Sequence, residues 1–365
     1  MPNRSGRSRT RPRQLPMFAT CTPGVGRLLR VQLAAADSID VTGSGFDGRC
    51  DIVFFDSDRA GRAHALRSRL AEDVFAEIGR ANRGDRASQG GASRSRAAWA
   101  GAVASTAWPP TAVERALSVW ADEVRQLSGS MTYRVTAQVR GQVPLQRSDL
   151  RRAMAEVIGA DKPRWKFADP AQLDFELSEW HDGQYVAGLR IGAAAQRTGR
   201  PTELPGSLPA TVAAAMVQLA GDATAAPRGK TLLDPCCGAG TILAEATAAG
   251  WTAEGTDMDA AAVEAASRTA TGVPVQLGDA RDLLLADDCV SACVSWLPGQ
   301  APGSWQAFAG AVLAELSRVT RSGGRVVLLA PDLPRAVIPP ALRLRKQFPI
   351  QLRGAKLSIW VFHRA

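Results

Sequence analysis

Short apolar runs alternate with amphipathic segments throughout the second half of the chain. Five such runs predict β-strands, at residues 230–234, 252–257, 273–277, 289–295 and 325–330. Between the last two runs, one helical face carries Phe308, Val312, Leu316 and Val319. Strands that alternate with helices in this order predict a doubly wound α/β domain.

The first part of the chain has a mixed pattern, which predicts a small α+β unit. Residues 51–55 form a β-rich run. Residues 60–80 are expected to form a helix, because apolar residues recur there at four-residue steps, at Leu66, Leu70, Val74 and Ile78. Residues 81–105 are rich in Arg, Gly, Ser and Ala without periodicity, so they are expected to be an exposed linker.

The middle of the chain predicts a second α+β module. Thr111 and Ser148 are candidate N-caps for two helices. Strands are expected at residues 133–139, 173–177 and 185–191, with Gly183 in a hairpin turn before the last of them. A proline-started helix is predicted over residues 208–219, directly before the first strand of the α/β domain.

Composition limits the class of protein. The chain has 365 residues, 45% of them apolar and 22% charged, as in globular proteins with two or three domains. It contains no run of about 20 apolar residues, so no membrane helix is expected. No apolar core follows the N-terminal arginines, which argues against a secretory signal and favours the cytoplasm. The six cysteines are scattered and form no CxxC pair, so reduced thiols and no zinc site are expected.

The charge is unevenly distributed along the chain. The net charge is +9, and five arginines fall within the first 13 residues. This Ser/Pro/Gly-rich segment cannot bury a core and is expected to be disordered. A solvated tail and a tail that contacts RNA are both consistent with it.

The most informative motif is the glycine-rich loop that follows the first strand of the α/β domain. It runs Asp234-Pro-Cys-Cys-Gly238-Ala-Gly240-Thr241, and an amphipathic helix is predicted to begin at Thr241. The loop lacks the Lys-Ser/Thr of a P-loop and the third glycine of a dinucleotide fingerprint. Because a carboxylate at Asp234 suits a cationic amino acid or sulfonium better than a pyrophosphate, the loop predicts a site for such a ligand.

The pattern DPxCGxGT resembles motif I of class I S-adenosylmethionine (SAM) methyltransferases, in the branch that methylates nucleic-acid bases. Two runs at residues 348–352 and 357–362 predict a closing β-hairpin, which is what this fold adds to the sheet. About 20 residues beyond the loop, Asp257 ends a strand, where a carboxylate binds ribose hydroxyls. The resemblance implies that Asp279 contacts the adenine amine and that Pro209 and Thr211 wall the pocket, although an ordinary packed helix explains the last two equally well. The full set of expected cofactor ligands is Asp234, Cys236, Gly238, Gly240, Thr241, Asp257, Met258, Asp279 and Ala280.

The expected catalytic segment is Ser295-Trp296-Leu297-Pro298, followed by Gly299. Enzymes of this kind that methylate base amines carry Asn or Asp, one residue, Pro and an aromatic residue here. The Asn oxygen accepts a hydrogen bond from the amine, and the aromatic ring stacks on the base. Here Trp296 occupies the Asn position, and the aromatic residue after Pro298 is missing. Either Ser295 is the acceptor and Trp296 the stacking ring, or the chain binds RNA or SAM without catalysis.

The first half resembles the ferredoxin-like and THUMP domains of RNA-modifying enzymes. The resemblance rests on the sequences FATCTPGVGRLL, AEDVF, YRV, RSDLR and QYVAGLR and on Trp165. It implies a THUMP-containing tRNA methyltransferase of guanine-N2 type. The expected organisation is a basic tail (1–15), a ferredoxin-like domain with linker (16–105), a THUMP-like RNA-binding domain (106–200) and a Rossmann-like methyltransferase domain (201–365). A catalytically impaired RNA-binding protein and a methyltransferase with another substrate are the alternatives.

Overall fold

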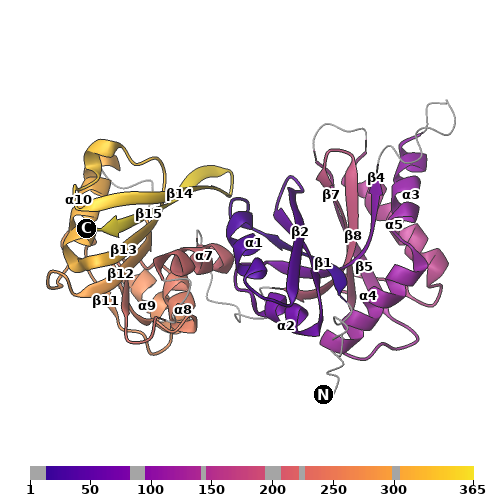
Figure 1. The fold of residues 1–365 in the computed structure, drawn as a ribbon, viewed down its shortest axis with the longest axis horizontal. Coiled ribbons are helices and arrows are strands. Elements are labelled where there is room, and N and C mark those ends of the chain that lie inside the picture. The colour runs from indigo at the N-terminus through magenta and orange to yellow at the C-terminus, as the bar shows by residue number, and fades with distance from the viewer. Residues whose placement is uncertain (1–13, 83–94, 141–144, 194–206, 222–226, 298–304) are drawn as a thin grey trace, which may run out of the picture. The chain divides into compact units, whose positions relative to one another are not determined.

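The computed structural model describes residues 14–82, 95–140, 145–193, 207–221, 227–297 and 305–365. The chain divides into two compact units. The first contains the residues up to Thr20, Leu29–Ser68 and Asp73–Ala193, and the second contains Cys21–Leu28, Arg69–Glu72 and Ala194–Ala365. In Figure 1 the chain is coloured from indigo through magenta in the first unit to orange and yellow in the second.

The first unit is built on one eight-stranded sheet of order β2-β3-β1-β4-β8-β7-β5-β6. Its elements are β1 (Leu15–Cys21), α1 (Gly26–Ala34), β2 (Ile39–Phe46), β3 (Asp51–Ser57), α2 (Arg59–Arg67), β4 (Asp73–Asn82), α3 (Arg96–Thr106), α4 (Pro110–Glu123), β5 (Thr132–Gln138), α5 (Arg147–Asp161), β6 (Lys166–Phe167), β7 (Leu173–His181) and β8 (Gln184–Ala193). Strand β4 pairs antiparallel with β8, with Ala76 opposite Leu189. Strands from both sides of the predicted division near residue 105 therefore belong to a single sheet.

An aromatic cluster fills the centre of this sheet. Phe18, Phe54 and Phe75 are fully buried, and the rings of Phe18 and Phe75 stack with centroids 4.6 Å apart. Their partners in the cluster, Ile52 and Val186, come from β3 and β8. The cluster joins strands from the two predicted modules, which explains why they share one core.

The helix predicted over residues 60–80 is wrong in its second half. Helix α2 ends at Arg67, and Val74 and Ile78 lie on β4. Residues 74–78 of this central strand are all buried, so their pattern lacks the alternation that marks a half-buried strand. The four-residue spacing of apolar residues was therefore coincidental.

The predicted linker over residues 81–105 also requires correction. Residues 81 and 82 end β4, residues 83–94 lie outside the described part, and helix α3 begins at Arg96. Ser95 caps α3 by accepting a hydrogen bond from the Ala98 N–H group, and Val103 is buried. The face that α3 buries is mostly alanine, which gives little apolar periodicity in the sequence.

Two predicted helix caps lie one or two residues inside their helices. Helix α4 has Pro109 at its N-cap instead of Thr111. Helix α5 has a capping box made by Gln146 and Asp149, so Ser148 is not its cap. A first-turn proline and a Gln cap both satisfy helix ends without the usual Ser or Thr signal.

The second unit contains a seven-stranded sheet of order β11-β10-β9-β12-β13-β15-β14. Its elements are α7 (Ala210–Ala220), β9 (Thr231–Asp234), α8 (Thr241–Ala248), β10 (Thr252–Asp257), α9 (Ala260–Thr269), β11 (Val275–Leu277), β12 (Val290–Trp296), α10 (Trp305–Val319), β13 (Thr320–Ala330), the 3₁₀ helix η1 (Arg335–Val337), β14 (Leu342–Leu352) and β15 (Ala355–Arg364). Strands β9 to β13 pair in parallel. Strand β15 is antiparallel to both β13 and β14.

This arrangement confirms the predicted doubly wound domain with a closing hairpin. Arg353 and Gly354 form the tight turn between β14 and β15, and both have positive φ. Figure 1 shows α8 and α9 on one side of the sheet and α10 on the other. On α10, Val312, Leu316 and Val319 are fully buried, as predicted. None of the helices in the described ranges is long and apolar enough to cross a membrane.

The strand order reverses direction between β9 and β12. The chain proceeds outward from β9 through β10 to β11, then crosses back to β12 on the other side of β9. In open α/β sheets a ligand binds beyond the carboxyl ends of the strands at such a reversal. A ligand site is therefore expected among the residues that follow β9 and β12.

Candidate active site

The glycine loop connects the carboxyl end of β9 to the first turn of α8. Gly238 and Gly240 have φ angles of 51° and 80°, in the left-handed region that favours glycine. A Cβ atom on Gly240 would lie 2.9 Å from the Cα of Ala266 in α9, closer than side chains approach. Glycine at position 240 is therefore required both by its backbone angle and by the neighbouring helix.

Asp234 is a buried carboxylate at the start of this loop. It is 1% exposed, and its Oδ1 accepts hydrogen bonds from the Ser295 hydroxyl at 2.7 Å and from the Cys236 N–H group at 3.3 Å. Its Oδ2 is buried and has no hydrogen-bond partner among the described residues. Burial disfavours the charged form and raises the pKa of Asp234 to about 7, although the bond from Ser295 acts in the opposite direction.

Asp257, at the end of β10, holds the loop from the other side. Its Oδ2 accepts a hydrogen bond from the Gly238 N–H group at 2.8 Å, and its Oδ1 accepts one from Asp259 N–H at 3.0 Å. Each carboxylate oxygen has two lone pairs, so both oxygens keep capacity for a ligand hydroxyl. The carboxylate predicted to bind ribose thus also fixes the shape of the glycine loop.

A cavity lies at the carboxyl ends of β9 and β12. Five of the predicted site residues line it: Asp234, Cys236, Gly238, Thr241 and Trp296. Ser207 and Leu208 also line it, although no motif in the sequence marks them as site residues. Their neighbours Pro209 and Thr211, predicted to wall the pocket, are not part of its lining, and Thr211 is buried on α7. A proline-started helix predicts the segment, but only tertiary packing decides which residue of it faces the cavity.

Met258 is not part of the cavity lining. It is 68% exposed just after β10, and Leu277, at the end of β11, is 63% exposed. Asp257 pairs with Leu277 in the strand register, so Met258 and Leu277 lie at the ends of adjacent strands. Two apolar side chains so placed suit a flat aromatic base. Leu277 carried no sequence signal beyond its place at a strand end.

Asp279 and Ala280 follow β11. Arg281 donates to both carboxylate oxygens of Asp279, with the shortest contact at 2.6 Å, and lowers the pKa of that carboxyl. A ligand amine at Asp279 would share this carboxylate with the Arg281 guanidinium. Ala280 is 6% exposed and belongs to the hydrophobic core of the unit, so its contribution is packing beneath the site.

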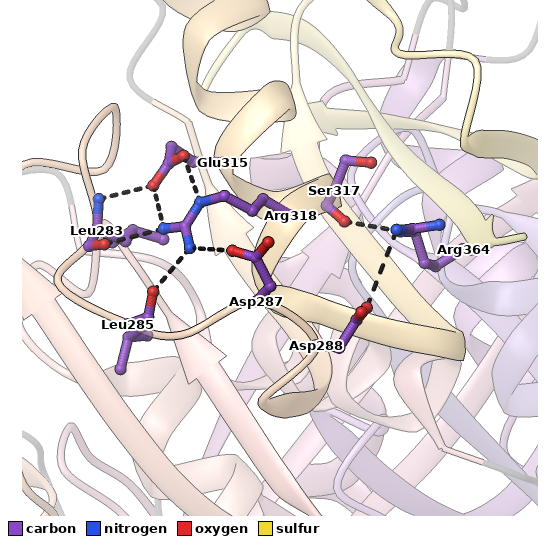
Figure 2. Close-up of polar contacts among 8 residues, drawn as sticks. All are labelled: Leu283, Leu285, Asp287, Asp288, Glu315, Ser317, Arg318 and Arg364. Atoms are coloured by element: carbon purple, nitrogen blue, oxygen red, sulfur yellow. Dashed lines mark hydrogen bonds and ion pairs between the residues drawn. The ribbon is translucent and has the colours of Figure 1, made fainter.

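The loop that follows these two residues is fastened to α10 by Arg318 (Figure 2). The guanidinium donates to the carbonyl oxygens of Leu283 and Leu285 at 2.9 and 2.7 Å, and to the Asp287 carboxylate at 2.8 Å. Glu315 orients the guanidinium and also accepts a bond from the Leu283 N–H group at 2.8 Å. Arg318 therefore holds residues 283–287, which follow Asp279 along the chain, against α10.

The four predicted catalytic residues occupy different positions relative to the cavity. Trp296, at the end of β12, lines the cavity. Leu297 is fully buried in the hydrophobic core, and its N–H group donates to the Leu329 carbonyl at 3.0 Å. Pro298 lies outside the described residues. The acceptor role predicted for Ser295 needs correction, because its hydroxyl is fully buried and donates to Asp234.

The residues at this edge fit SAM. The buried, unpartnered Asp234 oxygen suits a positively charged sulfonium or amino group, and the carboxylate of Asp257 suits vicinal hydroxyls. The strand order, the antiparallel last strand and the acid-led glycine loop together define a class I SAM-dependent methyltransferase domain. SAM is the cofactor of this fold.

Comparison with known proteins agrees with this class. Residues 197–338 match the family model described as "RMKL-like, methyltransferase domain". The whole chain is similar in fold to the crystal structure of TrmN from Thermus thermophilus, with a TM-score of 0.70 and 22% identity, covering 96% of this chain and 100% of that one. It is also similar to a possible methylase from Clostridium difficile 630, with a TM-score of 0.63 and 12% identity, over 97% of this chain and 99% of that one. No curated protein matches the chain significantly.

The raised pKa of Asp234 predicts pH-dependent cofactor binding. The pKa of Asp234 in the folded state is about 7, above the usual 3.8. The stability that this group gives to the folded state is therefore present below pH 4 and is lost as pH rises from about 4 to 7. SAM binding has the opposite sign, because its positive charge favours the ionised carboxylate. The dissociation constant is expected to fall about tenfold between pH 6 and pH 8, which calorimetry would measure.

Two variants control this prediction. Ser295→Ala removes a hydrogen bond that lowers the pKa of Asp234, so the midpoint of the pH dependence should move upward. Asp234→Asn cannot ionise and should bind weakly at every pH. A pH dependence that persists unchanged in Asp234→Asn would assign it to another group.

Proposed function

We propose that this chain transfers a methyl group from SAM to an exocyclic amine of an RNA base, with N2 of guanine in tRNA as the first substrate to test. The observation that carries the proposal is the position of Trp296. Its indole lines the same cavity as Asp234 and the glycine loop, at the edge of the sheet where the cofactor binds. An aromatic ring beside a methyl donor suits a flat base.

The RNA partner is supported by the first half of the chain. Its sequence motifs resemble those of ferredoxin-like and THUMP domains, and the likeness to TrmN extends over the whole chain instead of stopping at the methyltransferase domain. A base inside an RNA helix cannot reach a recessed cavity, so the target nucleotide would be turned out of its stack into the pocket.

The residues act by binding and orientation. When bound, SAM supplies an electrophilic methyl group. Asp234 attracts the positive charge of the cofactor, Asp257 holds ribose hydroxyls and the loop, and Trp296 stacks on the base. Ser295 is a positioning residue that fixes Asp234 through the 2.7 Å hydrogen bond. The proposal requires no covalent nucleophile, because the amine nitrogen would take the methyl group directly from the sulfonium. The sulfur–methyl bond would break to leave a neutral thioether, and the amine would release one proton.

Transfer of labelled methyl from SAM to bulk tRNA, followed by mass spectrometry of the nucleosides, tests the proposal. Trp296→Ala is expected to change the SAM dissociation constant less than about threefold and to lower kcat/KM for tRNA by about 5- to 150-fold, the range that corresponds to one base–aromatic stack. Trp296→Phe keeps an aromatic face and is the matched control. It should retain most of the activity.

The alternatives predict different results. If SAM binds but no RNA accepts label, while a protein or small molecule does, the chain is a methyltransferase with another substrate. If SAM and tRNA bind and no acceptor is labelled, the chain is an RNA-binding protein of the same fold. This second candidate is favoured by one observation, namely that Trp296 occupies the place where the related motif has an amine acceptor. Unchanged turnover in Trp296→Ala would contradict the stacking role.

A further inference from the structure

The cations of the second unit differ in whether an acid lies beside them. Arg268, Arg281, Arg318 and Arg364 each lie within ion-pair distance of a carboxylate. A second group has no ion pair with an acid anywhere in the described part of the chain, and it lines two adjoining hollows. Its members are Lys230, Arg321, Arg325, Arg345 and Lys346, here called the basic groove. The two hollows share Arg325, and none of the carboxylates in the described ranges lines either of them.

The first hollow lies at the amino-terminal ends of the parallel strands. Its lining includes Lys230 before β9, Ser291 near the start of β12, and Arg321 and Arg325 from β13. The register between β12 and β13 shifts there, because Val290 pairs with Thr320 but Ala292 pairs with Arg325. The extra residues of β13 bulge out of the ladder, which re-aims its side chains. Gly323 and Gly324 are part of this bulged strand.

Neutral partners orient the arginines of this hollow. The Arg321 guanidinium donates to the Ser291 hydroxyl oxygen, which also accepts a hydrogen bond from Thr231 N–H at 3.1 Å. Arg325 donates to the carbonyl oxygens of Leu219, at 3.0 Å, and Gly221 at the end of α7. These bonds fix the positions of the two guanidinium groups, and no acid among the described residues compensates their positive charges. Such an arrangement favours an external anion.

The second hollow continues the positive charge onto the closing hairpin. Arg345 and Lys346 are exposed on β14, an edge strand of the sheet. Between Leu344 and Lys346 the register of β14 shifts against β15, which makes Arg345 an extra residue in the ladder. Two separate irregularities of the sheet thus contribute cations to one continuous surface.

We infer that the basic groove binds the phosphate backbone of RNA. An extended row of unpaired cations from several elements matches a chain of phosphates better than a single small anion. The first hollow lies at the strand edge opposite to Asp234 and Trp296, so the bound phosphates are not those of the reacting nucleotide. The groove holds a flanking part of the same RNA. The identity of the partner rests on the proposed function.

A pair of triple variants tests this inference in the full-length protein. Lys230→Gln/Arg345→Gln/Lys346→Gln removes three exposed groove charges and spares Arg321 and Arg325. The matched control removes three exposed charges elsewhere in the same unit, and it consists of Arg268→Gln, Arg335→Gln and Lys356→Gln. Binding of a fluorescent tRNA is measured from 50 to 300 mM salt. The groove variant is expected to lower the slope of log Kd against log salt by about 2 to 3, since each phosphate contact contributes about 0.7 to 0.9. The control should keep the slope of the wild type.

Methyl transfer separates this inference from the proposed function. The groove variant should raise the KM for tRNA while kcat and the SAM dissociation constant stay at wild-type values. If the wild type methylates RNA and the groove and control variants show the same salt slopes, the inference fails and the function stands. If no RNA is methylated, the proposed function fails, and the salt slopes still decide whether the groove binds RNA. If the groove variant loses binding to an acidic protein but binds tRNA as tightly as the wild type does, the inference is overturned.

Discussion

Replacing Asp257 with alanine is expected to abolish measurable SAM binding. The carboxylate fixes the glycine loop by accepting a hydrogen bond from the Gly238 N–H group at 2.8 Å, and it is the group that we propose binds the ribose hydroxyls. Each hydrogen bond to a charged group contributes about 1.5–3 kcal/mol. Loss of two such bonds to the cofactor, together with a loosened loop, should weaken binding by more than about 100-fold. Calorimetry with the purified protein measures this loss.

Asp259→Ala is the matched control for this experiment. Asp259 lies two residues further along and is exposed, and its carboxylate caps α9 by accepting a bond from Ala261 N–H at 2.9 Å. Its removal should cost about 1 kcal/mol of stability and leave the dissociation constant nearly unchanged. An Asp257→Ala protein that binds SAM within tenfold of the wild type would show that Asp257 only supports the loop.

The second large effect is expected from Gly240→Ala. The new Cβ would lie 2.9 Å from the Cα of Ala266, which belongs to the backbone of α9 and cannot rotate away. The residue would also have to keep a φ of 80°. The left-handed backbone costs about 1–2 kcal/mol and overpacking about 1–3 kcal/mol, so the second unit should lose about 2–5 kcal/mol of stability. Thermal unfolding followed by circular dichroism would detect this.

Gly238→Ala separates stability from binding. Gly238 also has positive φ, at 51°, but a Cβ there meets no atom of the described residues within 4 Å. The variant should therefore fold with a loss of only about 1 kcal/mol, while its methyl group enters the cavity and weakens SAM binding. Equal unfolding temperatures for Gly240→Ala and the wild type would refute the steric argument about α9.

The two ends of the parallel strands in the second unit carry different kinds of side chain. The carboxyl ends carry the buried acid, the glycine loop and Trp296. The amino-terminal ends carry arginines that are oriented by hydroxyl and carbonyl groups and have no acidic partner in the described part of the chain. A substrate that reaches both edges must be large and must carry negative charge along its length. RNA meets this requirement. The salt dependence of tRNA binding tests the contact at the amino-terminal ends, and methyl transfer tests the contact at the carboxyl ends.

The sequence by itself determined the elements whose cause is local. The glycine loop needs a left-handed backbone, which only its glycines supply easily, so its position was readable from DPxCGxGT. The closing hairpin was readable from two apolar runs around Arg353 and Gly354. The position of Asp257 at the end of β10 was readable because strand length and loop spacing fix where a strand ends. In each case the physical constraint acts over a few neighbouring residues.

Only the tertiary structure decided the features that depend on distant partners. Ser295 bonds to Asp234 across 61 positions of sequence, so its role as a buried donor could not be inferred from its own neighbours. Val74 and Ile78 lie on a central strand, whose burial on both faces removes the alternation that marks strands. The unpaired arginines of the basic groove look like any other arginines in the sequence. Whether a charge is neutralised depends on which side chains the fold brings beside it.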